Sequence, residues 1–520
     1  MKDLFEAVGF LQRSGPAEIA RLAKSSRETL DAALRLEVVF RRGASAENGL
    51  PRRSSEHESA ALGLSAEVGG RDGAKGYGYS GIEIGHAALK PVKLMQAIRN
   101  GFKAAHERAR LNAKRNAELR RQYGAGAAPG AGIPLPAAQA DIAACYARDP
   151  RLVTNAEIAA LALEASRAMA QLGHEVVFNT VSAFTELRHE LFIGSEGTLI
   201  FQGFAVSQGD CYVVAQSGSG YQECHDTIGQ QRGLECLAEG WPEHPASNPD
   251  LMSFALEMGR EARTVAAAPP LKAPDGEVVV VTDPHFNALI AHEIVGHPSE
   301  ADRALKMEAG YAGRSWLLRS LSDNEIGRRI GSPMLSACSD PALHAYGHYD
   351  YDHEGTPGRR VMHIDRGEFS GFLNSRATAA LLGVEPNGSV RASQVQYAPL
   401  IRMSNTFFMA GDSPPEKLIG EVEHGYYVCG NRIPSIAESR ESFRISARRI
   451  YEIDHGQLGR LFRAGSLMGG SKHFFMHVDG VGNDLRLIAI PNCGKGQPMQ
   501  VKRMSNGGPT LRSRAWLGGE

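Results

Sequence analysis

The chain has 520 residues, a formal net charge of −1, 42% apolar residues and 22% charged residues. This length exceeds what one hydrophobic core usually serves, so we expect at least two domains. The near-zero charge excludes a general electrostatic attraction of the whole molecule to nucleic acid or acidic membranes, and the composition is typical of a soluble globular protein.

The cysteines indicate a reducing compartment. There are seven, an odd number, scattered without a CxxC pair, so we predict no disulfide framework. The start, MKDLFEAVGFLQRSG, has an acidic residue at position 3 and no sustained apolar run, unlike a secretory signal. No apolar run approaches the roughly 18 residues that cross a bilayer. We therefore expect a cytoplasmic protein with no membrane segment.

The first 136 residues predict two helices, a strand and a turn. Residues 15–36 have helical spacing of apolar positions, and 35–41 (LEVVFRR) is typical of a strand. The glycine-rich 69–81 predicts a turn or hairpin and lacks the Gly-Lys-Ser/Thr of a phosphate loop. The basic helix expected over 91–122 could be a nucleic-acid patch, but we prefer a solvated helix face. Residues 124–136, rich in Gly, Ala and Pro, predict a flexible connection.

A capped helix and several strands follow. Thr154 or Asn155 is a suitable cap for a helix that reaches about Gly173. Runs with strand pattern come next, separated by Gly, Ser and Asp, which favours an antiparallel sheet. These runs are 175–194, 198–207 and 210–221.

The middle of the chain predicts an amphipathic helix over 224–238 and a proline-rich joint over 241–249 (WPEHPASNP). A helix over 251–263 and a strand over 277–283 (EVVVVTD) follow. The next helix carries His292.

The predicted fold class is α+β, because short strands with Gly and Pro turns dominate after residue 330. We expect an N-terminal domain of helices and antiparallel strands over 1–245. A C-terminal, mostly antiparallel β domain over 246–520 would carry the His292 helix.

The stretch ALIAHEIVGHPSEAD (288–302) raises the question of a metal site. His292 and His297 are five residues apart, whereas the usual HExxH motif spaces them by four. Five residues rotate about 500° around an α-helix, which leaves the imidazoles roughly 140° apart. A shared metal therefore requires the helix to end at Gly296 or to widen into a π-turn, and Pro298 disfavours α geometry at His297. The alternative is a helix end with one histidine exposed and one packed.

The same stretch resembles the HExxxH signature of the TldD/PmbA family of zinc metallopeptidases. The family's active subunit carries His-Glu-x-x-Gly-His followed by Glu and Asp, here His292, Glu293, Gly296, His297, Glu300 and Asp302. Three later segments also resemble family motifs: YDYDHEGTP (349–357), IRMSNTFFMAGD (401–412) and NCGKGQP (492–498).

The resemblance implies one Zn²⁺ held by His292, His297 and Cys493, with Glu293 as the general base that activates the metal's water. Two imidazoles and a thiolate are good zinc donors and leave a fourth position open. Without the resemblance, Cys493 ranks no higher than Glu300 or Asp302 as the third ligand.

Three further histidines lie near the second motif. The family usually has Asp where this chain has His353, so a role for that position is not carried over. His344 and His348 precede it. A second metal site is one interpretation of these residues, and a polar lining of the cleft is the preferred one.

The histidine pair is typical of the catalytic subunit, because PmbA-type (TldE) partners lack it. The resemblance implies a peptidase for short or unfolded peptides that works as a dimer, with a second copy or an inactive TldE-like subunit. Two alternatives remain: a non-catalytic regulatory or scaffold subunit, which could associate with nucleic acid, and a metal hydrolase of a non-peptide amide.

Overall fold

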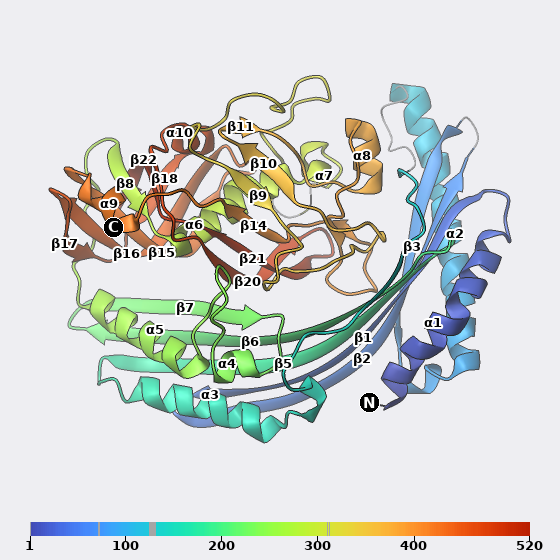
Figure 1. The fold of residues 1–520 in the computed structure, drawn as a ribbon, viewed down its shortest axis with the longest axis horizontal. Helices are drawn as coiled ribbons and strands as arrows, with labels where there is room; N and C mark the ends of the chain where they lie inside the picture. Colours follow the sequence, from blue (N-terminus) through green and yellow to red (C-terminus); the bar gives the residue numbers. More distant parts are fainter. Residues whose placement is uncertain (1, 71–72, 124–131, 309, 311–312, 520) are drawn as a thin grey trace.

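The computed structural model describes residues 2–70, 73–123, 132–308, 310 and 313–519. The first half of the chain forms one long, curved, seven-stranded sheet (Figure 1) in the order β3-β2-β1-β5-β6-β4, with β7 beside β6. Neighbouring strands are antiparallel except β4 and β6, which are parallel. The strands are β1 (Thr29–Glu47), β2 (Leu50–Gly69), β3 (Lys75–Ile84), β4 (Gln139–Ile142), β5 (Val176–Gly194), β6 (Leu199–Ser217) and β7 (Gly220–Gln230).

Helices cover one face of this sheet and make two cores with it. One core joins the sheet to α1 (Lys2–Ala23) and α2 (Pro91–Tyr123), and the other joins it to α3 (Asn155–Ala170) and α5 (Leu251–Ala266). Thr154 caps α3 through a capping box with Glu157, as the sequence predicts. Figure 1 shows the remainder of the chain on the opposite, concave side of the sheet.

Two predicted helices are wrong in extent. The helix expected over 15–36 ends at Ala23, and β1 begins at Thr29 because residues from there on pair with β2. The helix expected over 224–238 is helical only at α4 (Glu235–Ala238), because 220–230 pair with β6 as a strand. Residues 220–225 alternate between buried and more exposed positions, a period of two that belongs to strands. In both places, pairing within the sheet overrides local helical spacing.

The second half contains two further sheets and a two-stranded ribbon. The six-stranded sheet has the order β11-β10-β9-β14-β21-β20, and the seven-stranded one has the order β15-β8-β22-β18-β16-β17 with β19 beside β22. The strands of the six-stranded sheet are β9 (Ala337–Ser339), β10 (Val361–Asp365), β11 (Glu368–Phe369), β14 (Asn405–Phe408), β20 (Arg486–Lys495) and β21 (Gln500–Gly508). Those of the seven-stranded sheet are β8 (Val278–Thr282), β15 (His424–Ile436), β16 (Ser442–Asp454), β17 (Gln457–Phe462), β18 (Ser466–Gly470), β19 (Gly480–Val481) and β22 (Leu511–Gly518).

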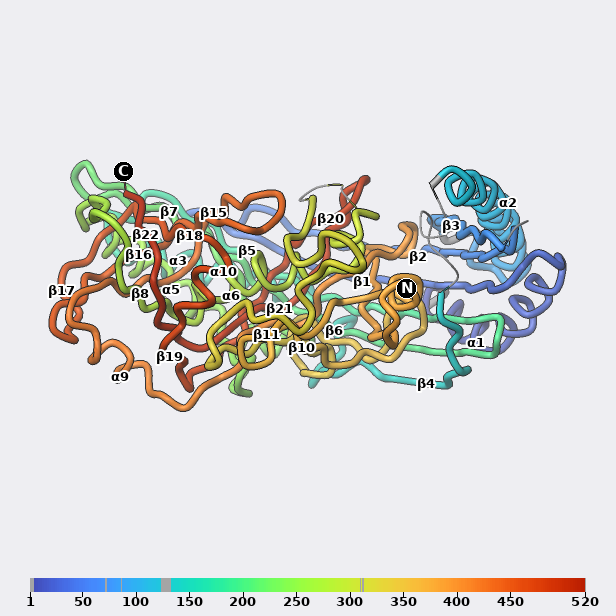
Figure 2. Tube along the Cα trace, turned by 90° about the horizontal axis from the view of Figure 1, so that it is seen from above, coloured from blue at the N-terminus to red at the C-terminus, as the bar shows by residue number. Residues whose placement is uncertain are grey.

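The ribbon is β12 (Val390–Arg391) with β13 (Leu400–Ile401). The α-helices of this half after α5 are short: α6 (Pro284–Ile290), α7 (Ala301–Ala304), α8 (Arg376–Leu382), α9 (Pro415–Gly420) and α10 (Ser471–Met476). A large hydrophobic core surrounds α6 and the turn that follows it. In the tube view of Figure 2, α6 lies among other elements of the second half, such as α10 and β21. This packing fixes the segment that carries His292.

The α+β fold class, with mostly antiparallel sheets, is confirmed. The domain boundary near residue 245 stays a prediction. Of the flexible connection expected over 124–136, residues 124–131 lie outside the described residues. Among the described helices, none is both long and apolar enough to cross a membrane.

Candidate metal centre

The helix that carries His292 changes its winding at that residue. Asp283 caps α6 by accepting a 2.7 Å hydrogen bond from the Phe286 backbone N–H. The α-helical part ends at Ile290, and Ala291–Gly296 is a π-helix whose last bond runs from the His297 N–H to the His292 carbonyl. Such a turn closes over five residues instead of four. The predicted non-α turn between the two histidines is therefore confirmed.

Gly296 and Pro298 act differently from the roles that the sequence suggests. The Gly296 backbone has φ −65° and ψ −60°, ordinary right-handed values. A Cβ there would lie 1.8 Å from the Met403 Sδ, so glycine is needed for close packing. His297 also keeps helical angles, φ −59° and ψ −44°. Pro298 lies in the first turn of the 3₁₀ helix His297–Ser299, where its missing N–H is not required.

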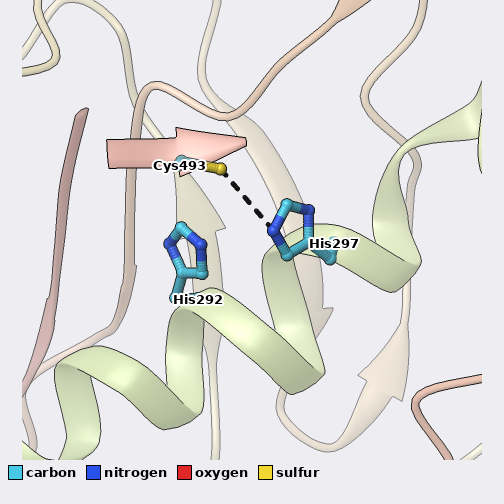
Figure 3. Close-up of side chains that lie close together, drawn as sticks. All are labelled: His292, His297 and Cys493. Carbon is cyan, nitrogen blue, oxygen red and sulfur yellow. Dashed lines mark hydrogen bonds between the residues drawn. The ribbon is translucent and has the colours of Figure 1, made fainter. Parts of the chain in front are cut away.

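The winding brings His292, His297 and Cys493 together. The candidate ligand atoms of the three residues lie within 4.8 Å of one another. The ring centroids of the two histidines are 4.7 Å apart, and the Cys493 Sγ is 3.6 Å from the His297 Nε2. Figure 3 shows both rings and the β20 thiol pointing toward one another. All three residues are buried, with 3–5% of their surface exposed.

The outer nitrogen of each imidazole has its own hydrogen-bond partner. The His292 Nδ1 lies 2.9 Å from the Asn506 Oδ1, and the His297 Nδ1 lies 3.1 Å from a Glu300 carboxylate oxygen. With both acceptors occupied by Nδ1–H, each Nε2 is the nitrogen that would bind a metal, after loss of its proton where it is protonated. Partners of this kind orient metal-binding histidines.

The charges of the cluster favour a thiolate. Burial raises the pKa of the Cys493 thiol, but the charges of His292, His297 and Arg402 outweigh it and hold that pKa well below its usual range. Burial lowers the pKa of His292. The Cys493 thiolate and the hydrogen bond to Asn506 raise it more, to about 9. A thiolate with two imidazoles is a donor set that suits a soft divalent metal such as zinc.

The two other candidates for third ligand are engaged elsewhere. Glu300 is fully buried and accepts from the Arg303 Nε at 2.6 Å, with the Lys495 Nζ at 3.2 Å. Burial raises the pKa of Glu300, but Lys495, His297 and Arg303 lower it far more. Asp302 accepts from the same Lys495 ammonium at 2.7 Å. Glu300 contacts the outer nitrogen of His297, whereas the group of side chains able to share a metal at this site consists of Cys493 and the two histidines.

Glu293, the candidate base, follows His292 directly. One of its carboxylate oxygens accepts a 2.5 Å hydrogen bond from the Arg440 Nη1, and the two side chains are 12% and 5% exposed. Arg440 lies in the loop between β15 and β16. Nothing in the local sequence points to Arg440, because no local pattern connects positions 147 residues apart.

Two motif residues that the sequence analysis did not interpret support the Cys493 strand. Arg402 is fully buried, and its guanidinium donates to the carbonyls of Cys493 and Gln500, on the two strands of the β20–β21 hairpin. Lys495 also donates to the Ile401 carbonyl at 2.8 Å. Both residues lie in segments that resemble family motifs, 401–412 and 492–498, and this resemblance was the sequence signal that could have identified them.

The three other histidines of the sequence analysis lie apart from this cluster. His353 contacts Glu190 of β5 at 3.0 Å and the Arg35 guanidinium of β1. The ring centroids of His344 and His348 are 4.1 Å apart with their planes tilted by 41°, and the His348 Nδ1 bonds to the Pro341 carbonyl. Among the described residues, the groups able to share a metal include none of these three.

Known proteins resemble the chain in sequence and fold. The family model for the PmbA/TldA metallopeptidase C-terminal domain matches residues 275–515. A metalloprotease of Methanothermobacter thermautotrophicus is 32% identical over 375 residues, which cover 72% of this chain and 76% of that protein. The zinc metalloprotease TldD homolog of Saccharolobus solfataricus is 30% identical over 239 residues, 46% of this chain and 50% of the relative.

The solved structure of TldE from Thermococcus kodakarensis shares the fold, with a TM-score of 0.68 and 16% identity over 99% of this chain and 100% of TldE. A solved structure from Thermotoga maritima reaches a TM-score of 0.69 at 15% identity, over 96% of this chain and 99% of that one. Sequence match and fold agree, and the chain belongs to the PmbA/TldD family of metallopeptidases.

Proposed function

We propose that this protein is a zinc-dependent peptidase that hydrolyses short or unfolded peptides. The observation that supports this most directly is the buried cluster of His292, His297 and Cys493 with Glu293 next in the chain. His292 and His297 would bind one Zn²⁺ through Nε2, and Cys493 through its thiolate. Three protein ligands leave a fourth position open, as catalytic zinc sites require.

Zinc bound there would polarise the peptide carbonyl and make water more acidic. Glu293 would take a proton from the attacking water while the water oxygen bonds to the carbonyl carbon. It would return that proton to the amine nitrogen as the C–N bond breaks. The hydrogen bond from Arg440 fixes the orientation of the Glu293 carboxylate, which is what a general base in a buried site needs.

The zinc content and activity of four variants test this proposal. We expect about one zinc per wild-type chain, and its loss in His292→Ala and Cys493→Ala, because each removes a ligand. Glu293→Gln should keep zinc but lose roughly 10²–10⁴-fold in peptide hydrolysis, the usual contribution of a general base. Cys429→Ala, at another buried cysteine, is the control and should keep zinc.

The measurements are elemental analysis of the purified proteins and cleavage of a fluorogenic peptide. Wild type without stoichiometric metal, or unchanged zinc in both ligand variants, would sink the site. Full activity in Glu293→Gln would remove Glu293 as the base. The mass of the purified complex identifies the proposed partner, a second copy or a TldE-like subunit.

A further inference from the structure

A cavity of about 570 Å³ lies between the concave face of the first sheet and the β20–β21 hairpin. Its volume is that of a small-ligand pocket. None of the three candidate metal ligands lines it, but it adjoins them. Pro491, two residues before Cys493, lines the cavity, and so does Lys502, which pairs with Cys493 in the β20–β21 register.

The sheet presents polar side chains to this cavity by simple alternation. On β1, Leu36 and Val38 belong to the core under the helices, whereas Glu37, Val39 and Arg41 line the cavity. Successive strand residues point to opposite faces. The charged side chains of this face therefore form part of the cavity's inner wall. Burying a charge there is costly unless the charge has a partner.

Basic side chains outnumber carboxylates in this wall. Five arginine and lysine side chains line the cavity and three carboxylates oppose them. Burial lowers the pKa of one of the five, Lys502, to about 7, whereas the four arginines stay charged. Arg188 lies within 4.0 Å of all three carboxylates, and Arg503 binds one of them, Glu186, through both oxygens. Within the part of the chain that the structure describes, no carboxylate oxygen lies within 4.0 Å of the remaining three basic side chains. The five basic side chains are Arg41, Arg188, Arg391, Lys502 and Arg503, and the carboxylates are Glu37, Glu186 and Glu190.

Arg41 is the best placed of these cations to receive an anion. Its guanidinium stacks 3.6 Å from the Phe184 ring centroid, which fixes its plane and leaves the N–H edge for a ligand. Glu186, opposite Arg41 in the β1–β5 register, is already bound by Arg188 and Arg503. Burial and the nearby Arg503 charge lower the pKa of Arg41 and outweigh the opposite effect of the Glu186 and Asp210 carboxylates.

We propose that this cavity binds a carboxylate of the peptide substrate and that Arg41 receives it. The inference rests on the proposed function, because it takes the ligand to be a peptide. The carboxylate can come from an acidic side chain or from the peptide's C-terminus. Planar guanidinium groups bind carboxylates through paired hydrogen bonds. Peptides with an acidic residue or a free terminus near the cleaved bond are then the preferred substrates.

Equilibrium binding of labelled peptides tests the site without relying on hydrolysis. Fluorescence anisotropy compares a Glu-containing peptide, the same peptide with Gln, and each with an amidated C-terminus. In wild type, removing the recognised carboxylate should weaken binding about tenfold. That difference should vanish in Arg41→Gln, persist in part in Arg41→Lys, and stay intact in Arg53→Gln. Arg53 is an exposed arginine of β2 that does not line the cavity.

The peptide change that weakens binding identifies the source of the carboxylate. A loss on Glu→Gln points to the side chain, and a loss on amidation points to the terminus. Equal affinity of all four peptides for wild type, or a preference that survives Arg41→Gln in a protein with unchanged thermal unfolding, overturns the proposal.

Mass spectrometry of the recovered peptides distinguishes a failure of the carboxylate site from a failure of the proposed peptidase function. Intact peptides with a carboxylate preference support the binding site and count against the peptidase. Cleaved peptides without a preference support the peptidase and overturn the binding site.

Discussion

Fully buried charged side chains surround the candidate metal ligands, and each has a polar partner that explains its burial. Arg402 and Lys495 are both 0% exposed. Arg402 donates to backbone carbonyls, and Lys495 lies between the carboxylates of Glu300 and Asp302. Buried charges persist only when paired or hydrogen-bonded in this way. At the residue scale, the motif residues Arg402 and Lys495 therefore support the strand that carries Cys493.

His363 of β10 leads to a prediction about pH. It is fully buried, with its Nδ1 bonded to the Gly371 carbonyl and its Nε2 to the Ser339 hydroxyl. Burial lowers its pKa to about 4, against roughly 6.5 in the unfolded chain. Below pH 6.5 the unfolded state therefore binds more protons, and stability falls until the pH reaches the folded-state pKa. Between pH 7 and pH 5, this histidine should cost about 2 kcal/mol of unfolding free energy.

Urea unfolding at pH 7 and pH 5, with a chelator present so that metal release does not contribute, measures this cost. His363→Gln should lose about 2 kcal/mol less than wild type over that range. His174→Gln, at a side chain that is 96% exposed, should follow wild type. Identical pH dependence in His363→Gln and wild type would contradict the assignment.

At the scale of the element, the π-turn of Ala291–Gly296 is the feature that lets a five-residue spacing serve one site. An α-turn there would leave the imidazoles roughly 140° apart. The turn is held by tight packing, since the Met403 Sδ occupies the space of a Gly296 side chain. The same segment therefore couples the stability of the core to the geometry of the two histidines.

Gly296→Ala tests that coupling. Its methyl group would overlap the Met403 Sδ, and we expect a loss of about 1–3 kcal/mol in the free energy of unfolding, the usual cost of overpacking. Zinc affinity should fall as well, because the turn must shift. Gly420→Ala, at the end of α9 where a Cβ would meet no atom within 4 Å, is the control. Calorimetry and zinc titration measure both effects, and wild-type stability in Gly296→Ala would refute the packing argument.

At the scale of the whole molecule, the second half of the chain lies on the concave side of the curved first sheet (Figure 1). Residues of both parts line the 570 Å³ cavity. Contacts such as those of His353 with Arg35 and Glu190 join the two halves. The adjacent metal cluster is at most 5% exposed. If the proposed peptidase function holds, a peptide would have to enter as an extended chain, for which pairing with a strand would provide tolerant binding.

We therefore expect strong discrimination against folded proteins. A small disulfide-bonded protein should be cut roughly 10³-fold more slowly in its native form than after reduction and alkylation, because only its unfolded fraction fits. Gel electrophoresis of the two forms over time gives the ratio. Equal cleavage rates would show that the site is open to folded substrates.

Much of the fold and part of the candidate site follow from local sequence. The helix of 91–122, the Thr154 cap and the strand expected over 175–194 were predicted correctly, since spacing and capping act over a few residues. The two strands expected over 198–207 and 210–221 are instead one strand, β6, which ends at Ser217. The strand at 220–230 was mistaken for a helix, because its partner β6 decides its conformation. Spacing alone also required a non-α turn between His292 and His297.

Only the tertiary structure decided which distant residues meet that turn. Cys493 lies 196 residues from His297, and Arg440 lies 147 residues from Glu293. On local grounds Cys493 ranked no higher than Glu300 or Asp302, and the family resemblance singled it out. The same holds for Arg41 and Lys502, which share a cavity although they belong to opposite ends of the chain. Local pattern determines how a segment winds, whereas contacts between remote segments depend on how the sheets pack, which no short stretch of sequence encodes.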